Sequence, residues 1–217
     1  MLPINPRIRS TCLHASWIID PINGTTSFTR RWPQFSNDIA YEDEYGPAVG
    51  VINMPMSRQM VVAGRGLGCW VLTGESPALK SGHRARVTRR TSARGARTQA
   101  LHPAGWPEEL LTALHRQVFL MASMGCIVDL VTGRADAVVI AGPPMGYEDV
   151  APMPVIVSEA GGRVTDLSGG PVLEGDMTVW PPTAYSTRPS WPWSTACRTA
   201  ATCMHSTTAC NSTGRRR

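Results

Sequence analysis

The stretch WIIDPINGTTSF, residues 17–28, constrains the fold more than any other part of this 217-residue chain. Its apolar start, Trp17–Ile19, predicts a short buried strand, which we expect Pro21 to end because proline cannot donate to a strand ladder. Asn23–Gly24 predicts a tight turn, and Thr25–Thr26 can begin a short helix. Carboxylate, carbonyl and hydroxyl oxygens at such a turn suit Mg²⁺, and N–H groups at a helix start suit phosphate.

The sequence after this turn predicts a sheet of short strands joined by glycine and proline turns. We expect strands at residues 38–41, 48–54, 60–63 and 69–73, in an antiparallel or mixed sheet with hairpins. GRGLG, residues 64–68, partly resembles a dinucleotide-binding loop. No helix pattern follows it, so a hairpin turn is the favoured interpretation.

The second half of the chain alternates helix and strand patterns. We expect helices from Pro107 to about Gln117, from Ser123 to Gly133, and from Glu148 to Gly161–Gly162, with Pro154 distorting the entry of the last one. Between and after them, strands are expected at residues 118–121, 137–141 and 163–167. This alternation behind a hairpin-rich half predicts a layered α/β or α+β domain, which we assign to residues 16–180.

Residues 74–105 form a basic segment within that domain. Lys and Arg occur seven times between residues 80 and 97, with no acidic residue among them. One interpretation is an RNA- or phosphate-binding patch. The other, which we favour because no aromatic residues are interleaved, is a solvated or partly flexible connecting insert.

The two ends of the chain differ from the domain in composition. Residues 181–217 carry five arginines and no Asp or Glu, so residues 1–180 are formally neutral and the net charge of +5 does not indicate nucleic-acid binding. Their Thr, Ser, Ala and Pro content predicts a disordered tail. Residues 1–15 are expected to be an irregular lead-in without the apolar core of a secretory signal. No apolar run approaches the ~20 residues of a membrane span, so we expect a cytoplasmic protein.

Three motifs, taken in order, resemble the signatures of the inositol monophosphatase family of Mg²⁺-dependent phosphatases. DPINGT, residues 20–25, is similar to the family's Asp-Pro-Ile-Asp-Gly-Thr, with Asn23 in place of the second aspartate. Residues 125–136 resemble its glycine-led helix ending in Gly-Arg-x-Asp. EDVA and EAGG, within residues 148–162, resemble its second metal motif, and residues 154–176 look most like the histidinol-phosphatase branch.

This resemblance implies a sandwich of the sugar-phosphatase type, here lacking its N-terminal helices, that hydrolyses the phosphate monoester of a small metabolite such as an inositol phosphate or histidinol phosphate. Mg²⁺ would be held by Asp20, the Ile22 carbonyl, Asn23 and Asp149. Asp20 and Thr25 would act in catalysis, with Thr25 orienting the attacking water. Phosphate would be received by Gly24, Thr25 and Thr26, and substrate by Gly125 and Cys126. Family members are commonly dimers, so a homodimer is possible.

Departures from the family pattern predict a weakened or lost activity. Asn23 offers a carbonyl oxygen but no negative charge, and the family's acidic pair some twenty residues before Asp20 would fall at or before Met1. We therefore expect Asn23→Asp to increase phosphate release. Taken singly, Asp20 could merely cap a turn and Asp149 a helix.

Two other functions remain open from the sequence. The first is a non-catalytic, truncated homologue that acts by binding, with apolar surface exposed where the absent helices would pack. The second is a basic nucleic-acid-binding module formed by residues 80–97 and the tail, which we rank last.

Overall fold

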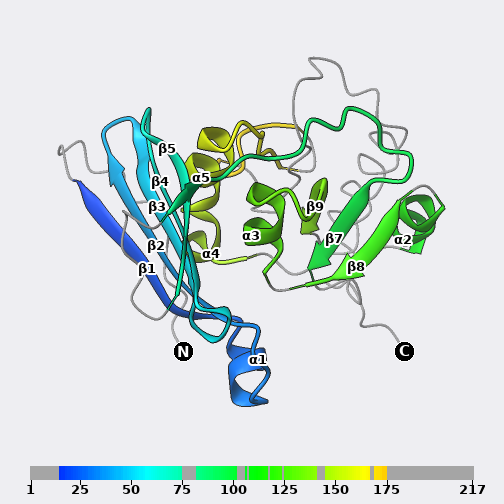
Figure 1. Cartoon of the computed structure of the whole chain (residues 1–217), viewed down its shortest axis with the longest axis horizontal. Helices are drawn as coiled ribbons and strands as arrows, with labels where there is room; N and C mark the ends of the chain where they lie inside the picture. The colour runs from blue at the N-terminus through cyan, green and yellow to red at the C-terminus, as the bar shows by residue number, and fades with distance from the viewer. Residues whose placement is uncertain are drawn as a thin grey trace, which may run out of the picture.

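The computed structural model describes residues 15–74, 82–101, 106, 108–116, 118–123, 125–140, 145–166 and 169–174. The predicted lead-in and tail lie outside these residues, except for Ala15. Sheets and helices alternate in layers: a six-stranded sheet, a layer formed by α3, α4 and α5, a three-stranded sheet, and α2 (Figure 1). The layered α/β prediction is confirmed.

The six-stranded sheet is an antiparallel meander whose strands pair in chain order. Its strands are β1 Ser16–Asn23, β2 Ser36–Asp43, β3 Gly46–Met54, β4 Gln59–Gly64, β5 Gly68–Thr73 and β6 His83–Arg84. The prediction that Pro21 ends β1 is wrong. Because β1 is an edge strand, the missing N–H of Pro21 costs no essential ladder bond, and the register with β2 shifts between Asp20 and Asn23.

The GRGLG sequence is a hairpin turn, as predicted. It joins β4 to β5, with Gly64 opposite Gly68. The Glu159 carboxylate accepts hydrogen bonds from the N–H groups of Gly66 (2.7 Å) and Gly68 (2.8 Å). The anion that these glycine N–H groups bind is therefore a side chain of the protein itself.

The three-stranded sheet is parallel and corrects our interpretation of the basic segment. Its strands, in the order β8 Phe119–Ala122, β7 Arg97–Leu101 and β9 Ala137–Ile140, place β7 in the centre. The flexible-insert prediction is wrong here, since Thr98 to Leu101 are buried. The charge of Arg97 is balanced by Asp136, 2.9 Å away. Residues 75–81 and 102–105 lie outside the described part.

The helices are shorter than predicted, and the last one is divided. They are α1 Thr25–Thr29, α2 Glu108–His115, α3 Cys126–Val131, α4 Tyr147–Val150 and α5 Met153–Glu159. Pro152 separates α4 from α5, and Pro154 lies in the first turn of α5, where it displaces no intrahelical bond. The strand predicted at 163–167 is wrong for residues 163–166, the described part of that range, where only Thr165 makes an isolated bridge.

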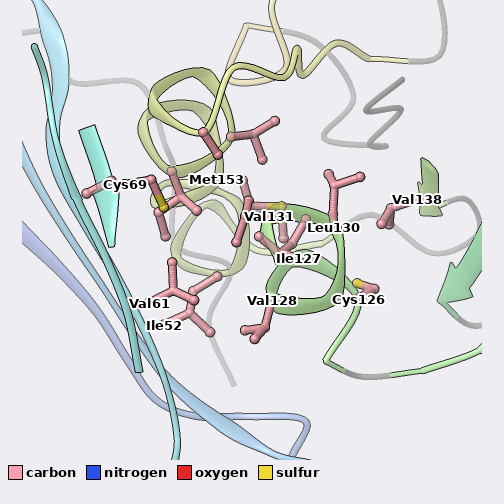
Figure 2. Close-up of a cluster of buried hydrophobic side chains, with 14 of the residues drawn as sticks. Ile52, Val61, Cys69, Cys126, Ile127, Val128, Leu130, Val131, Val138 and Met153 are labelled. Carbon is pink, nitrogen blue, oxygen red and sulfur yellow. The ribbon is translucent and has the colours of Figure 1, made fainter. Parts of the chain in front are cut away.

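Two apolar cores fill the spaces between the layers. The larger one lies between the meander and the α3–α5 layer, where Ile52 and Val61 face Ile127 and Val128 (Figure 2). Alternate residues of β9 face opposite ways: Val138 and Ile140 belong to this core, whereas Ala137 and Val139 pack with α2. A parallel strand buried on both faces is apolar throughout, which is why β9 was predicted correctly.

Gly50 sets the distance between the meander and α5. A Cβ at this position would lie 2.7 Å from the Pro152 carbonyl oxygen and 2.8 Å from Val155 Cγ1. Backbone atoms cannot yield as a flexible side chain can. The close approach of α5 to β3 therefore requires glycine.

We expect Gly50→Ala to lower the free energy of unfolding by about 1–3 kcal/mol, because α5 must move away from β3. Gly64→Ala is the matched control. Its Cβ would meet only the Leu67 side chain, which is exposed and free to move. Chemical denaturation of both variants measures the difference, and equal losses would contradict the packing argument.

The other face of the meander is apolar and partly exposed. Trp17 and Ile19 on β1 are 64% and 57% exposed, so the prediction that this strand is buried is wrong. They lie opposite Tyr41 and Ile39 on β2. The helices of the α3–α5 layer all lie on the opposite side of this sheet (Figure 1).

None of the helices among the described residues combines the length and apolar character needed to cross a membrane.

We expect this face to bind an apolar fluorescent dye. Replacing both Trp17 and Ile19 by Thr should reduce dye fluorescence and change stability by only about 0.5 kcal/mol, because threonine suits an exposed strand. Tyr45→Thr removes an exposed aromatic residue from the turn after β2 and serves as control. Equal fluorescence from the double variant and the parent protein would contradict this prediction.

Candidate cation and phosphate site

The turn after β1 has the local structure that its sequence predicts. Asp20 Oδ1 accepts a hydrogen bond from the Ile22 N–H (2.9 Å), so Asp20 does cap a turn. Gly24 has a left-handed conformation, with φ 85°, which favours glycine. The Thr25 hydroxyl donates to the Ile22 carbonyl (3.1 Å). These bonds hold the carboxylate, the carbonyl and the hydroxyl on one short turn.

α1 begins directly after this turn. Its first helical bonds run from the N–H groups of Ser27 (2.8 Å) and Phe28 (3.1 Å) to the Gly24 carbonyl. The N–H groups of Gly24, Thr25 and Thr26 precede this ladder, as the first N–H groups of any helix do. The predicted phosphate-binding residues therefore present backbone donors beside Asp20.

Asp149 reaches the same place from the other end of the chain. It lies on α4, which packs against β1 and β2. One carboxylate oxygen accepts from the Gly146 N–H (2.7 Å), so Asp149 also caps its helix. Its carboxyl group makes a side-chain hydrogen bond with Asp20 as well. The structure thus brings together the two aspartates that the sequence pairs.

The proximity of these carboxylates changes the acidity of Asp149. Burial is the main cause that raises its pKa to about 6, and the hydrogen bond and negative charge of Asp20 add to the increase. The Gly146 N–H acts in the opposite direction. Two carboxyl groups this close favour a bound proton or a bound cation between them.

Asp38 is a component of the site that the sequence analysis missed. It lies directly opposite Asp20 in the β1–β2 register and is only 2% exposed. Its Oδ2 accepts a hydrogen bond from Asn23 Nδ2 (2.8 Å). Its Oδ1, also buried, accepts no hydrogen bond of ordinary geometry from the described residues. The sequence signal that could have found Asp38 is strand alternation. In β2, Ser36, Asp38 and Ala40 point to the buried face and alternate with more exposed residues.

The surroundings of Asp38 disfavour its charged form. Burial is the main cause that raises its pKa to about 7; hydrogen bonds from Ser36 and Asn23 oppose this increase, and the charges of Asp20 and Asp149 add to it. Asp38 is therefore a third carboxyl group in the electrostatic field of the two predicted ligands.

Gly125 and Cys126 lie beside Asp38, at the start of α3. They line a small pocket together with Asn23, Ser36 and Asp38, whose remaining walls are mostly apolar. Burial raises the pKa of the Cys126 thiol to about 12, so the thiol is neutral at physiological pH. Cys126 therefore shapes the pocket rather than acting as a nucleophile.

The acidic residues of the motif in residues 125–136 have structural roles. Asp129 accepts hydrogen bonds from Gln99 Nε2 and Arg134 Nε, both 2.6 Å. Burial acts to raise the pKa of Asp136, but its hydrogen bonds with Arg97 prevail and lower that pKa to about 2. Asp129 thus connects α3 to β7, and Asp136 connects the start of β9 to β7.

The donor atoms at the turn fit a hard divalent cation. They are oxygens of Asp20, Asp149, the Ile22 carbonyl and the Asn23 amide. Mg²⁺ commonly takes one or two carboxylates and keeps several waters. No group of three or more His, Cys, Asp or Glu side chains among the described residues has the arrangement of a metal site. Asp38 Oδ1 is buried without a hydrogen bond of ordinary geometry, and a nearby cation would stabilise the charged form of this carboxyl group.

We expect the metal-free protein to be more stable at pH 5 than at pH 8. The folded-state pKa values of Asp38 and Asp149, about 7 and about 6, exceed the ordinary value of 3.8. The folded protein therefore binds more protons than the unfolded chain across this range, and the stability they contribute is lost as pH rises through these values. Asp136, with its lowered pKa, acts only below about pH 4.

Melting temperatures in the presence of a chelator, measured from pH 5 to pH 8, test this dependence. Asp38→Asn should flatten the profile, whereas Asp43→Asn, on the same strand but paired with Arg65, should leave it unchanged. A parent profile that does not fall with rising pH would contradict the assignment.

Comparisons with known proteins support the motif-based interpretation. A histidinol-phosphatase of Mycobacterium tuberculosis is 31% identical over 159 residues, which cover 70% of this chain and 59% of that protein. Human inositol monophosphatase 1 is 31% identical over 164 residues, with 72% and 57% covered. The chain therefore spans somewhat over half the length of these relatives.

The fold is also shared with solved structures. A staphylococcal IMPase-II structure matches with a TM-score of 0.73 and 20% identity, covering 92% of this chain and 75% of that one. The model of the inositol monophosphatase family matches residues 6–197, which extends beyond both boundaries we assigned to the domain. Motifs, fold and comparisons agree: the chain belongs to the inositol monophosphatase family.

Proposed function

We propose that this protein binds Mg²⁺ at the turn after β1 and hydrolyses the phosphate monoester of a small metabolite. The observation that carries the proposal is the meeting of Asp20 and Asp149 beside the start of α1. Carboxylates that suit a cation and backbone donors that suit a phosphate thus share one place. Membership in the family supports the same reaction class.

The cation would be held by Asp20, the Ile22 carbonyl, the Asn23 amide oxygen and Asp149. When bound, Mg²⁺ stabilises charge on phosphoryl oxygens and lowers the pKa of a water molecule. The N–H groups of Gly24, Thr25 and Thr26 would orient the phosphate. These residues would position the phosphorus atom for attack from the side of the cation.

Thr25 is suited to orient the attacking water. Its hydroxyl proton is committed to the Ile22 carbonyl, 3.1 Å away. The oxygen lone pairs therefore remain available to accept a hydrogen bond from water. Fixing the water in this way aligns its own lone pair with the phosphorus atom.

The substrate proposed is a phosphorylated alcohol of the kind named by the relatives, a histidinol phosphate or an inositol monophosphate. The resemblance of residues 154–176 favours the former. A cytoplasmic location and a homodimeric state stay predictions.

Phosphate release from histidinol phosphate and inositol monophosphate, with Mg²⁺ varied from zero to millimolar, tests the proposal. We expect Mg²⁺-dependent release that falls at least about 100-fold in Asp149→Asn, because the cation loses a charged ligand. Asp43→Asn is the control, as its carboxylate pairs with Arg65 away from the site. No release by the parent protein would reject phosphatase activity, whereas equal release by Asp149→Asn would reject the role of Asp149 in it.

A binding-only function is the second candidate, favoured by the amide at position 23 and the exposed apolar face of the meander. It gives a Mg²⁺-dependent rise in melting temperature without phosphate release. The nucleic-acid-binding alternative ranks below both. Arg90 and Arg97 contact Asp136, and the Arg84 guanidinium stacks over Trp70, so these residues of the basic segment have partners within the fold.

A further inference from the structure

Burying the Asp38 carboxyl group opposite Asp20 destabilises the folded protein, and the fold alone gives no reason for this placement. It is 2% exposed, one of its oxygens accepts no hydrogen bond of ordinary geometry, and it lies directly opposite Asp20. Like charges at directly opposite positions of an antiparallel pair are destabilising, and so is a buried polar atom without a partner. Such a side chain calls for an explanation, and a positively charged group that is present when the protein functions would supply one.

The bond between Asp38 and Asn23 connects this buried charge to the cation site. Asn23 Nδ2 donates to Asp38 Oδ2 over 2.8 Å. Because the amide nitrogen is committed to Asp38, the amide oxygen is the atom of this side chain that remains to bind a cation. An anionic acceptor on the amide nitrogen also increases the negative partial charge on the amide oxygen. The oxygen becomes a stronger ligand, as other ligands do when hydrogen-bonded to carboxylates.

We propose that Asp38 is a positioning residue of the cation site, which orients and polarises the Asn23 amide and supplies the negative charge that position 23 lacks. The inference rests on the proposed function for the existence of a cation site at this turn. It does not require that the bound cation lead to turnover. In this arrangement the Asp38 carboxylate does not contact the cation directly; the Asn23 amide lies between them and is hydrogen-bonded to Asp38.

This arrangement changes what is expected of Asn23→Asp. That substitution alone would place two carboxylates at the distance now spanned by the Asn23–Asp38 hydrogen bond. Their repulsion inside the protein would offset the gain of a charged ligand. The carboxylate becomes useful at position 23 only when Asp38 is made neutral, so the two positions should act as a coupled pair.

Calorimetric titration of the full chain with Mg²⁺, without substrate, tests the inference. The variants are Asp38→Asn, Asn23→Asp, and the exchange that combines both. We expect Asp38→Asn to weaken Mg²⁺ binding by about 10-fold or more. Asn23→Asp should not tighten it, and the exchange should return the affinity to within a few-fold of the parent or better. Asp43→Asn, a charge loss on the same strand, should have no effect.

A second measurement separates positioning from simple structural support. Asp38→Asn should not lower the melting temperature of the metal-free protein, because an amide removes repulsion with Asp20 and Asp149. It should, however, reduce the increase in melting temperature that Mg²⁺ produces. A purely structural residue would give the reverse: a lower metal-free melting temperature with unchanged Mg²⁺ affinity of the folded protein.

Several outcomes would overturn the inference. These are parental Mg²⁺ affinity in Asp38→Asn, equal affinity of Asn23→Asp and the exchange, or no Mg²⁺ binding by the parent. The comparison of Asn23→Asp with the exchange decides the matter even if Asp38→Asn fails to fold. Mg²⁺ binding without phosphate release would reject the phosphatase proposal alone. Release with unchanged Mg²⁺ dependence in Asp38→Asn would reject the role of Asp38 alone.

Discussion

Three carboxyl groups of the site repel one another, and the rest of the structure must hold them together against this repulsion. Asp20 and Asp38 lie opposite each other on the first two strands, and Asp149 approaches them from α4. Apolar packing must hold these groups together at a cost, since burial and mutual charge both disfavour their ionised forms. α5, seated against the bare backbone of Gly50, supplies part of that packing. The apolar packing of the fold supplies the free energy that offsets the repulsion among the three carboxyl groups.

Local signals in the sequence predicted the elements whose structure depends on local interactions. Asp20 and Gly24 shape the turn after β1 with their own side chain and backbone, so the motif could be interpreted without tertiary information. The glycine hairpin and the end of α3 near Gly133 follow from the same chemistry. The pairing of Asp20 with Asp149 was different, because it came from family resemblance rather than from the residues.

The errors arose where partners distant in the sequence decide the outcome. The sequence analysis did not predict β7 because Arg97 made the segment look like a solvated basic insert. The charge of Arg97 is neutralised by Asp136, which no local pattern shows. Pro21 is tolerated within β1 only because that strand is at an edge. Asp38 lay on a strand that was predicted correctly. Its importance depends on which face of the sheet the α3–α5 layer covers.

Acidic residues in the motifs differ in role according to what they contact. Asp129 and Asp136 bind arginine side chains and stabilise the second sheet. Glu159, in the EAGG sequence, binds the hairpin between β4 and β5 through two backbone N–H groups. Asp38 accepts from the Asn23 amide at one oxygen, and its other oxygen has no hydrogen bond of ordinary geometry from the described residues. The number of donors around a carboxylate, rather than its presence in a motif, separates structural acids from candidates for cation binding.

The sequential order of the meander has a consequence for the time course of folding. Every strand from β1 to β6 pairs with its neighbour in the chain, so the contacts within this sheet are local in sequence and favour rapid formation. Asp20 and Asp38 belong to the first strand pair, whereas Asp149 follows β7, β8 and β9 in the chain. During synthesis from the N-terminus, the three carboxyl groups cannot come together before residue 149 has been added. The strands of both sheets are made before the cluster can be complete.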